Sequence, residues 1–209
     1  MVMPDYRREA RALALQVLYE VDCTDHPVAE VLRERLEQLR ALPEAVARTL
    51  EMNDGVAGRA ERYRYMGGCA VVARGYNYAT ALEIALKVKE LTYVGANPYS
   101  SADFRHGPIA VVDRGYPVIL VAPSGAVYQD VVDLLGELRE REAEIIVLSD
   151  REQALAAART PLRLPAGVPE WLSPLTAIVP GQLLALYLAH ARDYDPDHPR
   201  GLRKVTETT

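Results

Sequence analysis

The sequence predicts a three-layer α/β fold, in which a doubly wound sheet of about five parallel strands lies between helices and follows an N-terminal helical segment. Three observations favour this fold. Short apolar runs alternate with segments of helical periodicity from about residue 67 onward, as in parallel sheets with helical crossovers. The apolar run Ala70–Ala73 meets Gly75 and then a helical pattern, which is typical of a strand–turn–helix unit. The 209 residues suffice for one such domain and an additional helical segment.

The first 65 residues are predicted to be helical. Residues 4–22 form an amphipathic pattern that begins near Pro4, with apolar residues three or four apart. A second helix is expected at Val28–Leu39, and one or two more between residues 41 and 65, where Asn53-Asp54-Gly55 marks a break. We therefore divide the chain into an N-terminal helical segment (1–38), a helical lead-in (39–66), the α/β domain (67–193) and a C-terminal tail (194–209).

Within the α/β domain, strands and helices alternate to the end. A short strand is expected after the helix that follows Gly75. Further strands are expected at Pro117–Ala122, Ala143–Leu148 and Pro161–Leu164. Helices are expected at Val127–Glu142, Arg151–Ala158 and Leu172–Ala191, the last interrupted at Pro180-Gly181.

Composition excludes several classes of function. The net charge of −5 does not favour nucleic-acid binding. Cys23 and Cys69 form no CxxC pattern, and the four histidines show no metal-ligand spacing, so we expect no metal and no other cofactor. We expect no leader peptide and no membrane span, because the N-terminus is charged early and the apolar runs fall short of roughly 18 residues. We therefore expect a cytoplasmic protein.

Three charged residues on one predicted helix are the first candidates for chemistry. Glu83, Lys87 and Glu90 are spaced i, i+4, i+7 and fall on one helix face. The alternative is a solvent-facing stripe of ion pairs. However, the chain has only three lysines among 24 basic residues, and two of them lie in this helix. Lysine can lose its proton or form an imine, whereas arginine cannot.

Two loops at the carboxyl ends of predicted strands supply further candidates. His106 lies in the polar sequence Arg105-His106-Gly107-Pro108, where ligands of open α/β sheets bind. Ser124-Gly125 opens a predicted helix, so its N–H groups could cradle an anion, and the alternative is that Ser124 is only the helix N-cap.

The segments ALEIALKVKELTY and SSADFRHGPIA, with the tail DPDHPRGLRKVTETT, resemble the sugar isomerase (SIS) domain. They are similar to the second such domain of the isomerase half of glucosamine-6-phosphate synthase, over about residues 40–209. The resemblance implies that Glu90 moves a proton between C1 and C2 of an open-chain sugar phosphate, with Lys87 assisting. It implies that His106 opens the sugar ring and that Lys204 forms an imine with the keto group. We expect the substrate to contact Gly75, Glu83, Ser124, Gly125 and Arg200.

The resemblance also implies what accompanies these residues. The family's glutaminase domain and first SIS domain have no counterpart in this sequence, so any aminotransfer would use free ammonia. The ring-opening histidine of the family reaches a neighbouring subunit, so a homodimer is expected, and a partner chain could supply a first SIS domain. Because that domain holds the substrate phosphate, its loss would cost rate as well as affinity.

Other functions remain open. The domain could bind a sugar phosphate as a non-catalytic sensor, or be a recombined product without activity. The run RREARALALQVLYEVD resembles the first helices of NusB-type antitermination factors, which implies RNA contacts through Arg7, Arg8 and Arg11. The match covers a fragment of that fold, so a helical dimer arm or fused remnant is the favoured interpretation and RNA is not an expected partner.

Overall fold

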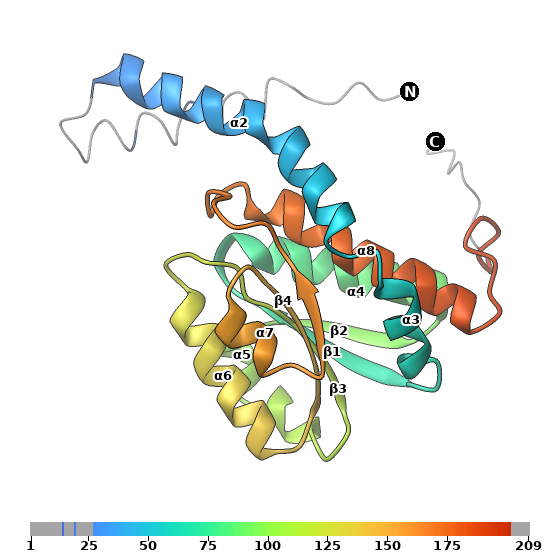
Figure 1. Cartoon of the computed structure of the whole chain (residues 1–209). Coiled ribbons are helices and arrows are strands. Elements are labelled where there is room, and N and C mark those ends of the chain that lie inside the picture. Colours follow the sequence, from blue (N-terminus) through green and yellow to red (C-terminus); the bar gives the residue numbers. More distant parts are fainter. Residues whose placement is uncertain (1–13, 15–18, 20–26, 202–209) are drawn as a thin grey trace, which may run out of the picture. The chain divides into compact units, whose positions relative to one another are not determined.

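The computed structural model describes residues 14, 19 and 27–201 (Figure 1). The chain divides into two units, residues 1–43 and residues 44–209. The helix expected at residues 4–22 lies outside the described residues except for Ala14 and Tyr19, which are helical. The NusB-like run and its arginines therefore stay a sequence-based prediction.

The helix α2 (Val28–Glu51) is longer than the sequence predicted. It continues past Leu39 and through Pro43 because Leu42, Val46 and Leu50 maintain the apolar spacing of an amphipathic helix. The expected end at Leu39 was wrong, whereas the break at residues 52–55 is confirmed. The short helix α3 (Val56–Ala60) and the 3₁₀ turn η1 (Glu61–Tyr63) follow this break.

Five parallel strands form the sheet, in the order β2-β1-β3-β4-β5. They are β1 (Gly68–Ala73), β2 (Gly95–Ser100), β3 (Pro117–Val121), β4 (Glu144–Ser149) and β5 (Thr160–Arg163). The central strands are continuous apolar runs that are almost wholly buried, as expected where helices cover both faces of a sheet. The predicted fold class and strand number are confirmed.

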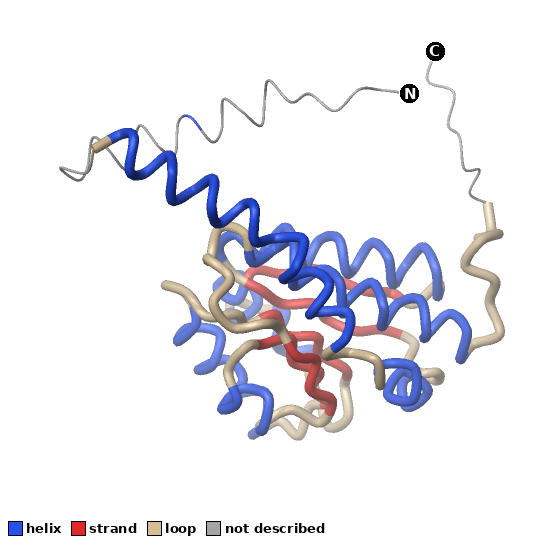
Figure 2. Tube along the Cα trace, turned by 45° about the horizontal axis from the view of Figure 1, so that its top comes forward, coloured by secondary structure: helices blue, strands red, loops and turns tan. Residues whose placement is uncertain are grey.

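Helices cover both faces of the sheet (Figures 1 and 2). One layer contains α3, α4 (Tyr78–Thr92) and α8 (Ser173–Ala191), and their apolar residues form one core with the sheet. The opposite layer contains α5 (Ser101–Arg105), η3 (Pro108–Val111) and α6 (Tyr128–Glu140), packed in a second core. The short helix α7 (Glu152–Ala156) contributes Ala154 to this second core.

The helix α8 differs from expectation in two ways. It continues through Pro180 and Gly181, which are both buried. Among the described residues it is also the one helix long and apolar enough to cross a membrane by length and composition alone. Leu184, Ala185 and Leu188 lie in the core that α8 shares with α4, so its apolar character is that of a core helix.

Candidate functional site

The helix α4 brings Glu83, Lys87 and Glu90 together, as their spacing predicted. The Lys87 Nζ lies 2.8 Å from Glu90 Oε2 and 3.7 Å from Glu83 Oε1. Each side chain retains about a third of its exposure, so the cluster is accessible without being fully solvated. The hydrogen bond to Glu90 raises the pKa of the Lys87 amine, against the opposing effect of burial. Lys87 is therefore an ammonium group shared between two carboxylates.

Local packing fixes the direction of α4. Its inner face carries Ala81, Ile84, Ala85 and Val88, which are fully buried, so the charged residues face outward. At its start, the Asn77 Nδ2 donates to Ser173 Oγ at 2.7 Å, which ties the beginning of α4 to that of α8. At its end, Tyr93 adopts a left-handed conformation (φ 59°) and its N–H donates to the Lys89 carbonyl.

A groove of about 280 Å³ lies beside Lys87. Its walls come from the end of α2, from α4 and from α8, and consist of Leu50, Leu91, Val179, Leu183 and Leu186. The Gln182 side chain is the other polar group of its lining. A largely apolar recess with one ammonium and one amide is typical of a ligand site that orients its ligand by a few polar contacts.

The C-terminal segment returns to the end of α4. The backbone N–H of Arg200 donates to the Tyr93 hydroxyl oxygen at 2.7 Å. The Arg200 guanidinium lies 4.7 Å from the centroid of the Tyr93 ring and 5.1 Å from that of Tyr194. Lys204 lies outside the described residues, so its expected role stays a prediction. The sequence analysis did not identify Tyr93 and Tyr194 as candidates. The one signal for them is that Tyr93 ends the segment ALEIALKVKELTY and Tyr194 begins the C-terminal tail.

The expected anion cradle lies at the carboxyl ends of β1 and β3, where helices leave the sheet on opposite faces. Gly75 (φ 60°) adopts a conformation that favours glycine, and a Cβ there would lie 3.5 Å from Val127 Cγ2. The Ser124 N–H and hydroxyl donate to Asp150 at 2.7 and 2.5 Å. Helix α6 has Val127 as its N-cap, so Ser124 does not cap it.

A second carboxylate fills the same loop. The Ala126 N–H donates to Glu170 Oε2 at 3.0 Å. Gly125 (φ 159°) makes room for this carboxylate, because a Cβ there would lie 2.6 Å from Glu170 Oε1. Asp150 and Glu170 thus accept from the Ser124 N–H, the Ser124 hydroxyl and the Ala126 N–H, which belong to the loop that was expected to bind an anion. From Tyr78, at the start of α4, to Glu90 the helix axis rises about 18 Å, so this loop and the Lys87 cluster are separate.

His106 lies in the opposite layer from Glu90. It is exposed and ends α5, whose Phe104 belongs to the second core, whereas Ile84 and Val88 of α4 belong to the first. The preceding Arg105 is fixed by 2.8–2.9 Å bonds from its guanidinium to Asp130 and Glu137. The structure therefore unites Glu83, Lys87 and Glu90, brings Arg200 to the end of their helix, and places His106 elsewhere. Within the described residues no three His, Cys, Asp or Glu side chains could hold a metal ion.

The parallel sheet with crossover helices on both faces defines a three-layer α/β domain, and the charged face of α4 is its candidate site. The family model of the SIS domain matches residues 69–192, so the chain belongs to the SIS domain family.

Curated relatives refine this assignment. The chain is 40% identical over 163 residues to the glutamine–fructose-6-phosphate aminotransferase (isomerizing) of Pyrococcus horikoshii, covering 78% of this chain and 27% of that protein. It is 36% identical over 182 residues to the same-named protein of Legionella pneumophila strain Paris, covering 87% and 30%. The chain thus spans less than a third of the length of these relatives.

Solved structures agree with this relationship. The C-terminal domain of glucosamine-fructose-6-phosphate aminotransferase from Francisella tularensis superposes with a TM-score of 0.72 at 26% identity, over 82% of this chain and 48% of that one. Tagatose-6-phosphate ketose/aldose isomerase from Escherichia coli gives a TM-score of 0.66 at 25% identity, over 78% and 48%. The chain therefore carries a SIS domain similar to the isomerase domain of glucosamine-fructose-6-phosphate aminotransferase.

Proposed function

We propose that this domain binds a phosphorylated sugar and interconverts its ketose and aldose forms at Glu90, Lys87, His106 and Lys204. The observation that carries the proposal is the carboxylate–ammonium–carboxylate cluster of Glu83, Lys87 and Glu90 beside a groove. The curated relatives of this chain are named as isomerizing aminotransferases, and one structurally similar protein is named as a ketose/aldose isomerase. The proposed location is the cytoplasm.

The proton transfer assigns a separate role to each group. Glu90 as carboxylate removes the proton from C1 of the open-chain ketose and returns it to C2, which converts the ketose into the aldose. Lys87, whose pKa is raised, remains an ammonium and donates hydrogen bonds to Glu90 and to developing negative charge on the sugar oxygens. The imine with the keto group is assigned to Lys204, and ring opening to His106.

Deuterium exchange tests this function directly. We would follow fructose 6-phosphate by proton NMR in heavy water, with and without ammonium, using the full chain. Wild type should form aldose or incorporate deuterium at C1, and Glu90→Gln and Lys204→Ala should abolish both. Lys87→Met should reduce the rate at least tenfold, whereas Lys89→Met, on an exposed position of the same helix, is the matched control. Unchanged rates in Glu90→Gln and Lys204→Ala would refute the proposal.

A non-catalytic sugar-phosphate sensor is the second candidate. It is favoured by the loop after β3, where Asp150 and Glu170 already accept from Ser124 and Ala126. A chain whose own carboxylates fill this loop has lost an anchor for a phosphate group, and catalysis depends on such remote binding. Saturable broadening of the sugar signals without deuterium exchange would support this function over isomerisation.

We also propose that the domain forms a homodimer through the outer face of α4 and α8. Leu82, Leu86 and Leu175 on these helices are 41–50% exposed. Leu86 precedes the groove residue Lys87, and Leu175 lies about one helical turn before the groove residue Val179. Exposed apolar patches of this kind are typical of interaction sites. A second copy is the favoured occupant because His106 and Glu90 lie in opposite layers of one chain, so a complete site needs two chains. A partner chain with a first SIS domain is the alternative occupant.

Sedimentation velocity on the purified chain distinguishes these occupants. Wild type should sediment as a dimer, and Leu82→Arg with Leu86→Arg should give a monomer. Val111→Arg, at a 55% exposed position in the opposite layer, is the control and should remain dimeric. A monomeric wild type would refute the homodimer and leave the partner chain as the occupant.

A further inference from the structure

The helix α5, which ends one residue before His106, is linked to α6 by polar side chains at both of its ends. Each nitrogen of the Arg105 guanidinium donates to α6, Nε to Glu137 Oε1 at 2.8 Å, Nη1 to Asp130 Oδ1 at 2.9 Å and Nη2 to the Asp130 carbonyl at 2.8 Å. The hydroxyl of Ser101, at the start of α5, donates to Asp130 Oδ2. The Arg105 side chain retains 23% of its exposure, so these bonds are partly shielded from water. Both carboxylate oxygens of Asp130 thus accept from α5.

The carboxylate of Asp130 is half-buried and lies between two guanidinium groups. The Nη1 of Arg74, the residue after β1, lies 3.6 Å from its Oδ2, and the Nη1 of Arg105 lies 2.9 Å from its Oδ1. Burial opposes ionisation of this carboxylate, but the hydrogen bond from Ser101 and the two arginines outweigh it, so the pKa of Asp130 is lowered from its ordinary value. Asp130 is therefore ionised at neutral pH, and bonds to an ionised acceptor are roughly twice as strong as neutral ones.

The helix α5 depends on such contacts because it has only five residues. An isolated helix of this length is not stable in water, since closing the first turn fixes more residues than it forms hydrogen bonds. The Ser100 hydroxyl caps its start by accepting from the Asp103 N–H at 3.1 Å. On its inner side Phe104 is fully buried, with its ring centroid 5.2 Å from that of Tyr99. One buried ring does not fix the rotation of a helix, so the bonds to α6 supply the second attachment.

His106 takes its position from the backbone of α5. It is exposed, so packing of its ring in a core does not determine where it lies. It is the C-cap of α5, and its N–H donates to the Asp103 carbonyl at 3.1 Å. Gly107 (φ 147°) then turns the chain into η3, which begins at Pro108. A rotation or local unfolding of α5 would therefore move His106 directly.

We propose that Asp130 is a positioning residue for His106, which fixes α5 on α6 and thereby holds the histidine where it opens the sugar ring. This inference rests on the proposed function, which assigns ring opening to His106. Asp130 acts through Ser101 and Arg105 and needs no contact with the sugar. A group that transfers protons must stay within hydrogen-bond reach of the oxygen it serves. A displacement of about 1 Å can lower a rate roughly 100-fold, so the attachment of α5 matters for the chemistry as well as for the fold.

Hydrogen exchange of the full chain, followed by mass spectrometry of peptic fragments, tests the attachment without relying on activity. We expect Asp130→Asn to accelerate exchange of residues 101–107 about tenfold, because the neutral amide loses the charge-assisted bonds. Ser101→Ala, which removes one bond, should accelerate it about threefold.

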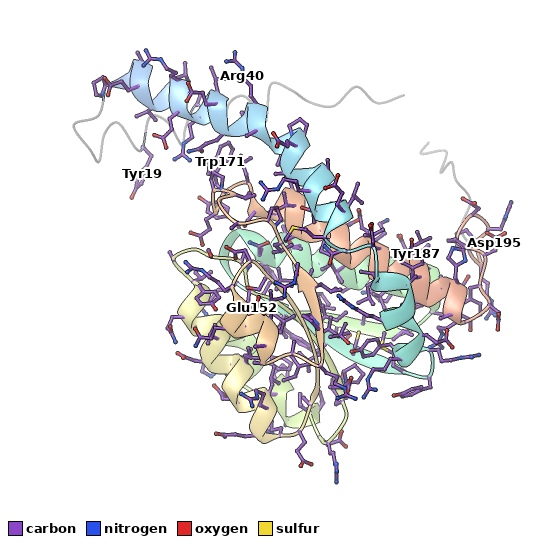
Figure 3. All side chains as sticks on the ribbon, in the orientation of Figure 1. Tyr19, Arg40, Glu152, Trp171, Tyr187 and Asp195 are labelled. Carbon is purple, nitrogen blue, oxygen red and sulfur yellow. The ribbon has the colours of Figure 1, made fainter. Side chains whose placement is uncertain are left out.

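Glu152→Gln is the matched control for this measurement. Glu152, labelled in Figure 3 at the start of α7, lies like Asp130 in the first turn of its helix and pairs with Arg163 at 2.8 Å. Its substitution removes the same charge and an arginine pair elsewhere, so residues 101–107 should exchange at the wild-type rate. Equal exchange rates of this segment in Asp130→Asn and Glu152→Gln would overturn the attachment.

Two substrates separate the positioning of His106 from a general effect on the domain. Fructose 6-phosphate closes its ring through the C5 hydroxyl oxygen, so the ring must open before isomerisation. 5-Deoxyfructose 6-phosphate lacks that oxygen and carries its phosphate on the C6 oxygen, so it stays open and does not need the histidine. Asp130→Asn should lower kcat about tenfold with the first substrate and less than about twofold with the second. His106→Ala should show the same preference, and adding Asp130→Asn to it should cause no further loss.

The kinetic outcomes decide the role of Asp130. An equal loss with both substrates would refute the positioning role, because it would show an effect on the whole domain. Ser101→Ala serves for both measurements if Asp130→Asn does not fold, with a loss of about threefold that is again confined to fructose 6-phosphate. A wild type that converts neither substrate would refute the proposed function, and the exchange rates would still decide whether Asp130 holds α5.

Discussion

Gly181 allows α8 to approach α4, and replacing it by alanine tests how closely the two helices pack. Gly181 is buried in α8, and its neighbour across the interface is the fully buried Ile84 of α4. A Cβ on residue 181 would lie 2.5 Å from Ile84 Cδ1, closer than side-chain atoms pack in proteins. Because Ile84 is one residue from Glu83, this contact also determines where the charged face of α4 lies.

Two opposing effects set the magnitude. Overpacking a core by one methyl group costs about 1–3 kcal/mol. Alanine in place of glycine within a helix stabilises the folded state by about 1 kcal/mol through its higher helix propensity. The difference is about 0–2 kcal/mol, so we expect Gly181→Ala to lower the free energy of unfolding by up to about 2 kcal/mol. In an Ile84→Ala background, which by itself costs about 2–5 kcal/mol, the opposing atoms are gone. There the same substitution should be neutral or stabilise by about 1 kcal/mol.

Urea unfolding of the four proteins in this cycle, followed by circular dichroism, measures the coupling between the two positions. Gly136→Ala in α6 supplies the control. A Cβ on residue 136 would have no neighbouring atom within 4 Å, so this variant should gain stability from helix propensity alone. If Gly181→Ala stabilised the wild-type chain as Gly136→Ala does, the close approach of α4 and α8 would be refuted.

Three further predictions concern buried polar groups. Burial raises the pKa of Tyr63 to about 12, above the value of about 10 in an unfolded chain, so its contribution to stability is present below pH 10 and lost as the pH rises toward 12. Wild type should therefore lose more stability than Tyr63→Phe over this range, and parallel curves would contradict this. Asn53 donates to the Thr49 and Arg163 carbonyls and accepts from the Arg163 N–H, so Asn53→Ala should cost about 2–3 kcal/mol in urea unfolding. If Asn53→Ala lost as little stability as Asp54→Ala, a substitution at the exposed neighbouring position, these hydrogen bonds would not contribute as predicted. Burial raises the pKa of the Cys69 thiol to about 12, so in a Cys23→Ser chain an aromatic disulfide reagent should react only after unfolding, and rapid native reaction would show that the thiol is accessible.

Much of the fold was predictable because its signals are local. Short apolar runs that end in turn residues located the strands of the sheet, in most cases within one or two residues of their observed bounds. The Glu83–Lys87–Glu90 contacts followed from helical spacing alone. The end of α2 was missed because Pro43 is a local signal to stop, whereas continued amphipathic spacing to Leu50 keeps the helix intact.

The candidate site was less predictable because it depends on contacts distant in sequence. Arg200 and Tyr93 are 107 residues apart, and no periodicity links them. The carboxylate of Glu170 reaches Ala126 from 44 residues away, so the filling of that loop could not be inferred from the loop's own sequence. Parallel topology places His106 and Glu90 in opposite layers, which follows only once the crossover directions are known.

Both strands at the margins of the sheet contain a proline, Pro98 in β2 and Pro161 in β5. A proline has no N–H to offer to an added strand, so each margin is a poor template for a neighbouring chain. Growth of the sheet from molecule to molecule, the usual first step toward fibrils, is therefore disfavoured at both ends. Helix surfaces, in contrast to sheet margins, can meet in a closed pair without extending further.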